Sequence, residues 1–231
     1  MRLAVPSYLV PGTWLENLEL AASIGWIRGV ELLFFAYDEE ARRILARELG
    51  GIAELSGALE LSLHLPDPLG PADEALVEAT RPFVGLFVAH PPKDGDPKTA
   101  ARWATLLGSW ISRYGPDFLL EYTGREPFAR AERELPGLPL CPDTGRLLLD
   151  GEDPARWIGE RAGRVRAVHA HAAREGKDHL ALTGEEAWLP ALIGLARERD
   201  WRLELEVFSL ELASASERAI ERAMGAAEGR L

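Results

Sequence analysis

The amino-acid sequence predicts an α/β fold, a single (β/α)8 TIM barrel that covers residues 1–231. Eight short apolar runs of the strand type alternate with longer amphipathic stretches. Several runs are almost continuously apolar, as is typical of parallel strands buried on both faces. Eight repeats of strand and helix favour a closed parallel barrel. No glycine-rich fingerprint follows the first strand, which argues against an open dinucleotide-binding sheet.

The expected strands are short and spread along the whole chain. The first contains Leu3 and Val5, and the second opens on Val30 and Glu31. In chain order they cover residues 3–9, 30–35, 61–64, 83–90, 118–122, 138–143, 165–171 and 202–208. Because the carboxyl ends of barrel strands meet at one rim, that rim is where we expect a functional site.

The stretches between the strands carry helix signals. Thr13 with Glu16 three residues later forms a capping box, and Asp38 precedes a run in which Ile44 and Leu45 face inward. Further helices are expected at residues 71–80, 97–114, 126–135, 154–162, 185–199 and 212–227. Residues 91–97 are rich in proline and glycine and are predicted to be the loop after the fourth strand. No linker divides the chain, so one domain is expected.

Charge and composition narrow the class of partner. The formal net charge of −11 repels phosphate backbones, so nucleic acid is not an expected partner. No run of about 18 apolar residues occurs, so no membrane span is expected. The first residues are interpreted as a strand, not a signal peptide, and the lone Cys141 cannot form an internal disulfide. A cytoplasmic location is therefore expected, while the sequence leaves the oligomeric state open.

Histidines and carboxylates gather at the predicted strand ends. They are His64, His90, Glu121, Asp143, His169, His171 and Glu206, with His179 in the loop after the seventh strand. A lone histidine at a strand end is more often a hydrogen-bonded structural residue. Several such residues on one rim, together with carboxylates that are costly to bury unpaired, favour a shared cation. Imidazole with carboxylate suits zinc, manganese or iron.

Four further residues have weaker signals. His171 lies on the same side of its strand as His169 and is expected behind the metal ligands or facing substrate. Glu31 either orients substrate or pairs with an arginine at the base of the barrel. Glu204 shares the inward side of Glu206 but lies deeper, and Cys141 is expected to fill the barrel as a small apolar residue.

Seven short motifs resemble the xylose-isomerase-like barrels, which include endonuclease IV and many sugar isomerases and epimerases. They are Leu63-His64-Leu65-Pro66, Ala89-His90-Pro91, Leu120-Glu121, Pro142-Asp143-Thr144-Gly145-Arg146, Val168-His169-Ala170-His171, Asp178-His179-Leu180-Ala181-Leu182 and Leu205-Glu206-Val207-Phe208. The resemblance implies two metal ions bridged by Glu121. One would be held by His64, His90 and Glu121, and the other by Glu121, Asp143, His169 and Glu206.

The third metal site of the endonuclease IV relatives is incomplete in this chain. Arg146 stands where the resemblance implies a histidine, and Ala172 stands where it implies an aspartate. Only His179, with its neighbour Asp178, remains of that group. We therefore expect two divalent ions, manganese or zinc with iron as an alternative. The guanidinium of Arg146 could instead bind a phosphate oxygen.

These departures make a metal-dependent hydrolase, a phosphodiesterase, the first functional hypothesis. The resemblance implies that sugar epimerases keep the histidine that Arg146 replaces, while the His64 and His90 pair matches the hydrolytic branch. Two metals bridged by Glu121 would share a hydroxide that attacks phosphorus. The expected catalytic residues are Glu121, Arg146 and His179, and the residues expected to contact substrate are Glu31, Tyr122, Arg146, His171 and His179.

A narrower resemblance concerns residues 6–17, 30–35 and 64–69, which are similar to cobamide-remodelling phosphodiesterases. Those enzymes cut the nucleotide-loop phosphodiester of B12-type cofactors, so the implied partner is a small phosphodiester, a corrinoid. Apolar contacts to it are expected from Phe34, Phe35, Tyr37, Tyr122 and Phe208. Three alternatives stay open. The first is a sugar or sugar-phosphate isomerase or epimerase that uses one metal, with Glu121 and Glu206 as acid and base. The others are an AP-endonuclease-like DNA hydrolase and a non-catalytic binding barrel.

Overall fold

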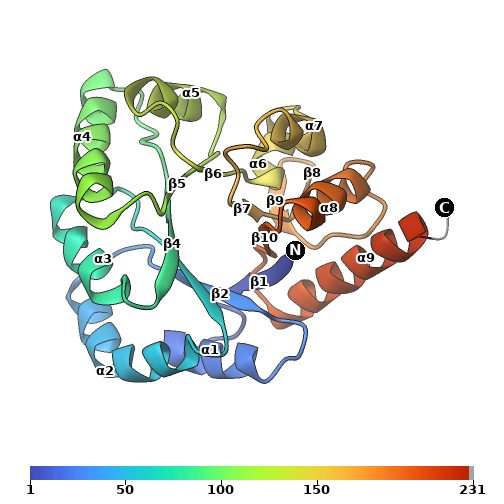
Figure 1. The fold of residues 1–231 in the computed structure, drawn as a ribbon, viewed down its shortest axis with the longest axis horizontal. Helices are drawn as coiled ribbons and strands as arrows, with labels where there is room; N and C mark the ends of the chain where they lie inside the picture. The colour runs from blue at the N-terminus through green and yellow to red at the C-terminus, as the bar shows by residue number, and fades with distance from the viewer. Residues whose placement is uncertain (229–231) are drawn as a thin grey trace.

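A computed structural model describes residues 1–228 and has eight parallel strands surrounded by helices (Figure 1). The strands of the barrel wall are β1 (Arg2–Pro6), β2 (Gly29–Leu33), β3 (Glu60–His64), β4 (Val84–Ala89), β5 (Phe118–Glu121), β6 (Leu140–Cys141), β7 (Ala167–His169) and β10 (Arg202–Glu204). Their order is β6-β5-β4-β3-β2-β1-β10-β7. The predicted domain runs to residue 231, and its residues 229–231 lie outside the described part of the chain.

The wall closes where the two ends of this sheet meet. Isolated parallel bridges join Leu140 to Val165 and Asp143 to His169. The backbone N–H of His169 also donates to the carbonyl of Pro142 at 2.9 Å. The predicted (β/α)8 barrel is therefore confirmed, and its carboxyl rim brings together side chains from strands far apart in the sequence.

The helices are α1 (Trp14–Ala22), α2 (Glu39–Leu55), α3 (Glu74–Thr80, after the 3-10 turn η1, Pro71–Asp73), α4 (Pro97–Tyr114), α5 (Arg125–Glu134), α6 (Thr144–Leu149), α7 (Pro154–Gly159), α8 (Leu189–Glu198) and α9 (Leu210–Glu228). The predicted capping box is present: Thr13 Oγ1 accepts the N–H of Glu16 at 3.4 Å, and the Glu16 carboxylate accepts the N–H of Thr13 at 2.7 Å. Among residues 1–228, no helix has the length and apolar character needed to cross a bilayer.

Helices α8 and α6 differ from the sequence prediction. Helix α8 begins at Leu189 and not at residue 185, because the Glu186 carboxylate accepts the N–H groups of Thr183 and Gly184 in a turn. Helix α6 was not predicted and starts directly after Asp143, whose carboxylate caps it by accepting the N–H of Arg146 at 2.9 Å. This cap holds the Asp143 side chain at the end of β6.

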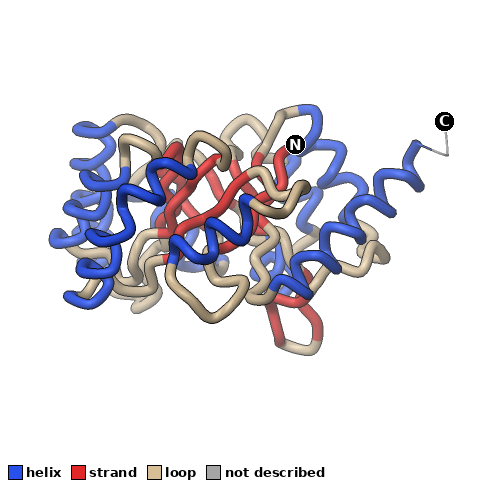
Figure 2. Tube along the Cα trace, turned by 90° about the horizontal axis from the view of Figure 1, so that it is seen from below, coloured by secondary structure: helices blue, strands red, loops and turns tan. Residues whose placement is uncertain are grey.

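An antiparallel hairpin follows β7 and was also absent from the prediction. Its strands are β8 (Ala172–Arg174) and β9 (Lys177–Leu180), and the turn places Glu175 at φ 53° and Gly176 at φ 76°. Figure 2 shows it projecting from the end of the barrel that lies away from the N-terminus. The seventh strand was predicted at residues 165–171, whereas the observed β7 is shorter and ends at His169. The hairpin therefore folds back beside the rim and carries His179 towards it.

The interior of the barrel is apolar on one side and polar on the other. Val88, Leu119, Cys141 and Ala167 form a small apolar cluster, so the predicted filling role of Cys141 is confirmed. Burial raises the pKa of the Cys141 thiol to about 12, which leaves it neutral. The polar side holds Glu31, Ser62, His169 and Glu204, all buried. This buried polar column lies beneath the rim and supports it.

Candidate metal centre

The six residues expected to bind metal all lie at the carboxyl ends of barrel strands. His64, Glu121 and His169 close β3, β5 and β7, and His90, Asp143 and Glu206 follow β4, β6 and β10 within two residues. A pocket of about 800 Å³ opens above them, lined by five of the six and by Arg146, His179 and Phe208. The sixth, His169, is fully buried and does not line the pocket.

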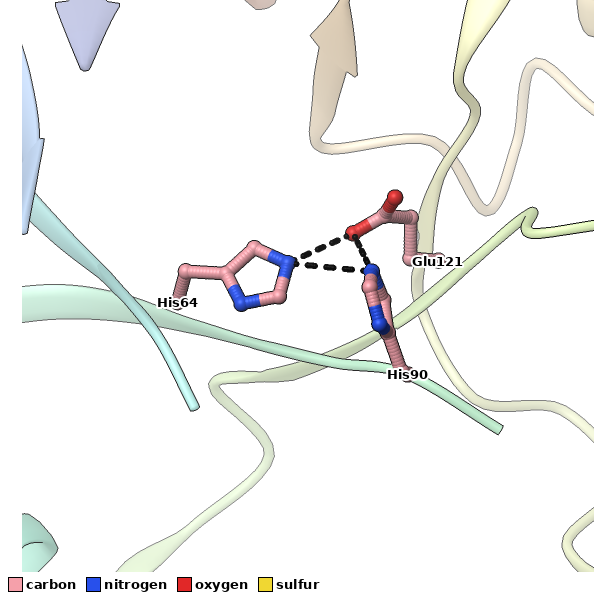
Figure 3. A group of neighbouring side chains, drawn as sticks. All are labelled: His64, His90 and Glu121. Atoms are coloured by element: carbon pink, nitrogen blue, oxygen red, sulfur yellow. Dashed lines mark hydrogen bonds and ion pairs between the residues drawn. The ribbon is translucent and has the colours of Figure 1, made fainter. Parts of the chain in front are cut away.

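His64, His90 and Glu121 form the first group (Figure 3). One carboxylate oxygen of Glu121, Oε2, lies 3.0 Å from His64 Nε2 and 3.1 Å from His90 Nε2. The two Nε2 atoms are 3.2 Å apart. Burial opposes the charged form of Glu121, but His90 and His169 lower its pKa well below the usual range. An ionised carboxylate therefore faces two imidazole nitrogens, a donor set suited to zinc or manganese.

Neighbouring groups fix the orientation of these two rings. His64 Nδ1 lies 3.0 Å from the carbonyl of Leu65, and His90 Nδ1 lies 3.0 Å from the carboxylate of Asp67. Since carbonyls and carboxylates accept hydrogen bonds, both Nδ1 atoms carry a proton and the Nε2 atoms face Glu121. Metal-binding histidines are commonly held in this way. The role of Asp67, which also binds Lys93 at 2.9 Å, was not found from the sequence.

The second group surrounds His169. Its Nδ1 lies 3.6 Å from Glu121 Oε2 and 3.4 Å from Glu206 Oε2, while Nε2 lies 3.2 Å from Glu31 Oε1. Within the described residues, both ring nitrogens of His169 and Oε2 of Glu206 are buried without a hydrogen-bond partner. Buried polar atoms of this kind are costly unless something satisfies them. The residues thus fit a cation at this position, and Glu121 Oε2 contacts both groups.

Glu31 lies below the pocket, which corrects the expectation that it contacts substrate. It is 2% exposed, and its carboxylate is held between His169 and the Ser62 hydroxyl, which donates to it at 2.9 Å. With Nε2 facing Glu31 Oε1 at ion-pair distance, His169 presents Nδ1 to Glu121 and Glu206. Glu31 is therefore a residue that orients His169, and Arg202 acts on its carboxylate more weakly than His169 does.

Tyr122, expected to contact substrate, is buried and does not line the pocket. Its hydroxyl donates to Asp150 at 2.7 Å, and its ring packs on Phe128 and Trp157 among the outer helices. Because side chains alternate along a strand, the residue after the inward Glu121 must point outward. Of the other aromatic residues, Phe34, Phe35 and Phe208 line the pocket. Phe35 is exposed, whereas Phe34 is buried and stacks on Trp14 with ring centroids 4.3 Å apart.

His171, expected behind the metal ligands or facing substrate, is fully buried and lies beside Asp143 and Glu206. Its Nδ1 accepts the backbone N–H of His179 at 2.9 Å, and its Nε2 lies 2.9 Å from Asp143 Oδ1. Burial opposes the charged ring, whereas Asp143 and Glu206 favour it and shift its pKa upward when no cation is bound. A proton on Nδ1 would nevertheless oppose the His179 N–H, so we assign the neutral ring with its proton on Nε2. The Nε2 proton of His171 then faces Asp143 Oδ1, and we do not assign His171 as a ligand, although Glu206 and His179 lie close enough to form a metal group with it.

The assigned tautomer of His171 is open to direct measurement. In the metal-loaded protein, long-range ¹⁵N–¹H NMR is expected to show one ring with a protonated Nε2 and a bare Nδ1 that His171→Asn removes. His64 and His90 serve as internal controls, because they are expected to show the opposite tautomer, with the proton on Nδ1. A His171 ring with two protons, or one whose signals shift on cobalt(II) binding as those of a direct ligand do, would contradict the assignment.

Arg146 and His179 both reach the pocket, as predicted for the rim. Arg146 Nη1 pairs with Asp178 at 2.8 Å, so part of its charge is already compensated. His179 has φ 52°, stacks on His171 with ring centroids 4.4 Å apart, and places Nδ1 at 3.1 Å from the carbonyl of Glu206. Sequence reasoning noted Asp178 as a neighbour of His179, but not its pairing with Arg146.

The pKa of His90 predicts how pH changes the stability of the metal-free protein. Burial opposes its charged form, but Glu121 and Asp67 outweigh burial and raise the pKa from 6.5 to about 9. A raised histidine pKa stabilises the fold below the unfolded value and loses this contribution as pH rises through the folded value. After EDTA treatment, the melting-temperature advantage of the native protein over His90→Asn is therefore expected to shrink between pH 6.5 and pH 9. A melting-temperature advantage that grows between pH 6.5 and pH 9 would refute the raised pKa of His90.

Comparison with known proteins identifies the fold. No protein-family model matches the chain, and no curated protein sequence matches it either. Among solved structures, a D-tagatose 3-epimerase-like protein is 16% identical with a TM-score of 0.76, over 100% of this chain and 99% of that one. The 3-keto-D-glucoside 4-epimerase YcjR from E. coli is 14% identical with a TM-score of 0.69, over 97% and 99% of the two chains.

A third structure is the probable 3-DHS dehydratase AsbF, involved in petrobactin synthesis, from Bacillus anthracis. It is 14% identical with a TM-score of 0.68, over 96% of this chain and 98% of that one. At such identities the likeness establishes the fold and not the activity. The chain thus shares the (β/α)8 barrel fold of these structures.

Proposed function

We propose that this chain is an enzyme that isomerises or epimerises a sugar or sugar phosphate with one divalent metal. The observation that carries the proposal is the pair of carboxylates around His169, since Glu121 Oε2 and Glu206 Oε2 lie 3.6 and 3.4 Å from its Nδ1. Two solved structures of this fold are named as an epimerase and as an epimerase-like protein, which supports the sugar hypothesis over phosphodiester hydrolysis.

The residues that would hold the metal are Glu121, Asp143, His169 and Glu206. A divalent ion bound there would polarise the carbonyl oxygen of the substrate and so lower the pKa of the C–H group next to that carbonyl. The chain itself orients this set: Glu31 holds His169, and both His171 and the N–H of Arg146 hold Asp143. Ligand side chains locked in this way need no rearrangement when substrate enters.

Proton transfer is assigned to the two glutamates. A carboxylate oxygen of one removes the proton from the carbon next to the carbonyl, and the other returns a proton to the opposite face or to the neighbouring carbon. Such positioned acid–base groups typically contribute about 10²–10⁴-fold to a rate. The buried Leu65 and the aromatic Phe208 line the same pocket and restrict water there.

Isotope exchange tests this proposal across a whole class of substrates at once. Protein loaded with manganese is incubated in D₂O with a panel of ketoses, aldoses and their phosphates, and proton NMR follows the carbon next to the carbonyl. Deuterium is expected at that carbon in at least one sugar, and EDTA is expected to stop the exchange. Absence of exchange across the panel, in protein with confirmed metal content, would reject the proposal.

A second candidate, cleavage of the cobamide nucleotide loop, is favoured by the group of His64, His90 and Glu121. A one-metal isomerase has no use for a second set of ligands around the same Oε2 atom. For Arg146 to bind a phosphate, it would have to share its guanidinium with Asp178. Adenosylcobalamin treated with the metal-loaded protein would then release cobinamide phosphate, detected by mass spectrometry, and an unchanged cofactor would exclude this substrate.

A further inference from the structure

A second cavity of about 650 Å³ lies directly beside the metal centre. Its floor is the N-terminal half of α4, from Thr99 to Ser109, and its walls are the loops that follow β3 and β4. We call it the α4 groove. It exists because α3 is short and meets α4 at that helix's far end, where the Tyr114 hydroxyl lies 2.8 Å from Glu74 and 2.9 Å from Glu78. The first half of α4 therefore extends past α3 towards the rim.

The α4 groove is apolar and rigid. Its apolar lining consists of Pro68, Leu69, Pro71, Pro92, Trp103 and Leu106. Three of these are prolines, whose fixed φ limits movement of the walls. Pockets of this size and composition are typical binding sites for small organic molecules.

The hydroxyl groups of the groove are already engaged within the helix itself. The hydroxyls of Thr105 and Ser109 donate to the carbonyls of Ala101 and Leu106 at 2.8 and 2.7 Å. Thr99 Oγ1 accepts from Arg102 at 2.9 Å. A ligand in this groove finds few free donors or acceptors, so apolar contact would dominate its binding.

The groove is continuous with the pocket over the metal centre. Asp67 and His90 line both cavities, and the hydrogen bond between them, at 3.0 Å, forms part of the shared wall. His90 Nε2 faces Glu121 on one side of this wall. A molecule whose polar end reaches the metal centre can therefore extend past Asp67 and His90 into the groove.

We infer that the substrate is larger than a free sugar and carries an apolar group, a sugar with an alkyl or aryl substituent, whose substituent occupies the α4 groove. This inference rests on the proposed function and specifies its substrate class. The occupant is the remote part of the substrate molecule, because the groove is continuous with the reaction pocket and its lining is mainly apolar. Its one arginine, Arg102, donates to Thr99 on the same helix.

Matched glucosides test the inference by binding. Titration calorimetry compares methyl, hexyl and phenyl β-D-glucoside on the manganese-loaded protein and on Ala101→Trp, which fills the groove from an exposed helix position. Hexyl and phenyl glucosides are expected to bind at least tenfold more tightly than methyl glucoside, about the effect of burying two methylene groups. Ala101→Trp is expected to abolish this gain and leave methyl glucoside unchanged. The matched control is Ala46→Trp, an equally exposed alanine on α2 that lines none of the described cavities.

The outcomes separate this inference from the proposed function. Equal binding of the glucosides, or a gain that persists in Ala101→Trp, would overturn the inference even if isotope exchange occurs with free sugars. A gain confined to the open groove, without isotope exchange in any sugar, would retain the groove and reject the proposed reaction. If Ala101→Trp instead dissociates an oligomer seen by light scattering, the groove is occupied by a second copy of the chain and the inference fails.

Discussion

Replacement of Glu121 by glutamine is expected to lower the rate of solvent deuterium exchange by about a thousandfold. The side chain keeps its size and one oxygen, but the amide can neither accept nor return a proton at neutral pH, and general acid–base groups contribute about 10²–10⁴-fold. Glu121 is 3% exposed, and its Oε2 atom lies close to both His64 and His169. The loss of rate should therefore exceed the loss caused by replacing any single histidine on the rim.

The measurement is the initial exchange rate by proton NMR, with metal content determined on the same sample. Glu126→Gln serves as the matched control, because Glu126 is exposed at the start of α5 and lies outside the pocket. A slow Glu121→Gln enzyme that retains its metal supports an acid–base role. If Glu121→Gln exchanges deuterium at a rate near that of the native enzyme, Glu121 is not an acid–base group of the reaction.

Replacement of Gly145 by alanine is expected to give the largest loss of stability in the rim. An added Cβ at this position would overlap Cε1 and Nδ1 of the His171 ring. His171 is fully buried between Asp143 and the backbone of His179, so it has no free space to move into. Overpacking of this kind costs about 1–3 kcal/mol, which corresponds to roughly 3–10 °C in melting temperature for a chain of this length.

Thermal unfolding of the metal-free and metal-loaded protein checks this result. Gly50→Ala is the control, since Gly50 lies within α2 and a Cβ there meets nothing within 4 Å. That variant is expected to be stabilised by about 0.4–1 kcal/mol, because alanine restricts the unfolded chain more than glycine does. The same Gly145→Ala protein should also bind metal more weakly, since a displaced His171 no longer holds Asp143. Unchanged metal affinity would disprove this role of His171.

The sequence by itself determined the architecture and the place of the site. Near-continuous apolar runs identified the buried parallel strands, and inward positions at their ends identified the residues on the rim. Residues such as His64 and Glu121 were found because a barrel brings strand ends together whatever lies between them. The outward direction of Tyr122 was available from the same alternation, because it follows Glu121 directly.

Contacts between distant segments were decided by the tertiary structure alone. The β8–β9 hairpin is held by local turn geometry, and it brings His179 onto His171 and Asp178 onto Arg146. Glu31 and His169 come from β2 and β7, and only closure of the barrel places them 3.2 Å apart. Sequence periodicity reports which side of a strand a residue faces, but not which partner it meets there. Whether a rim residue binds a metal, orients a ligand or touches substrate depends on that partner.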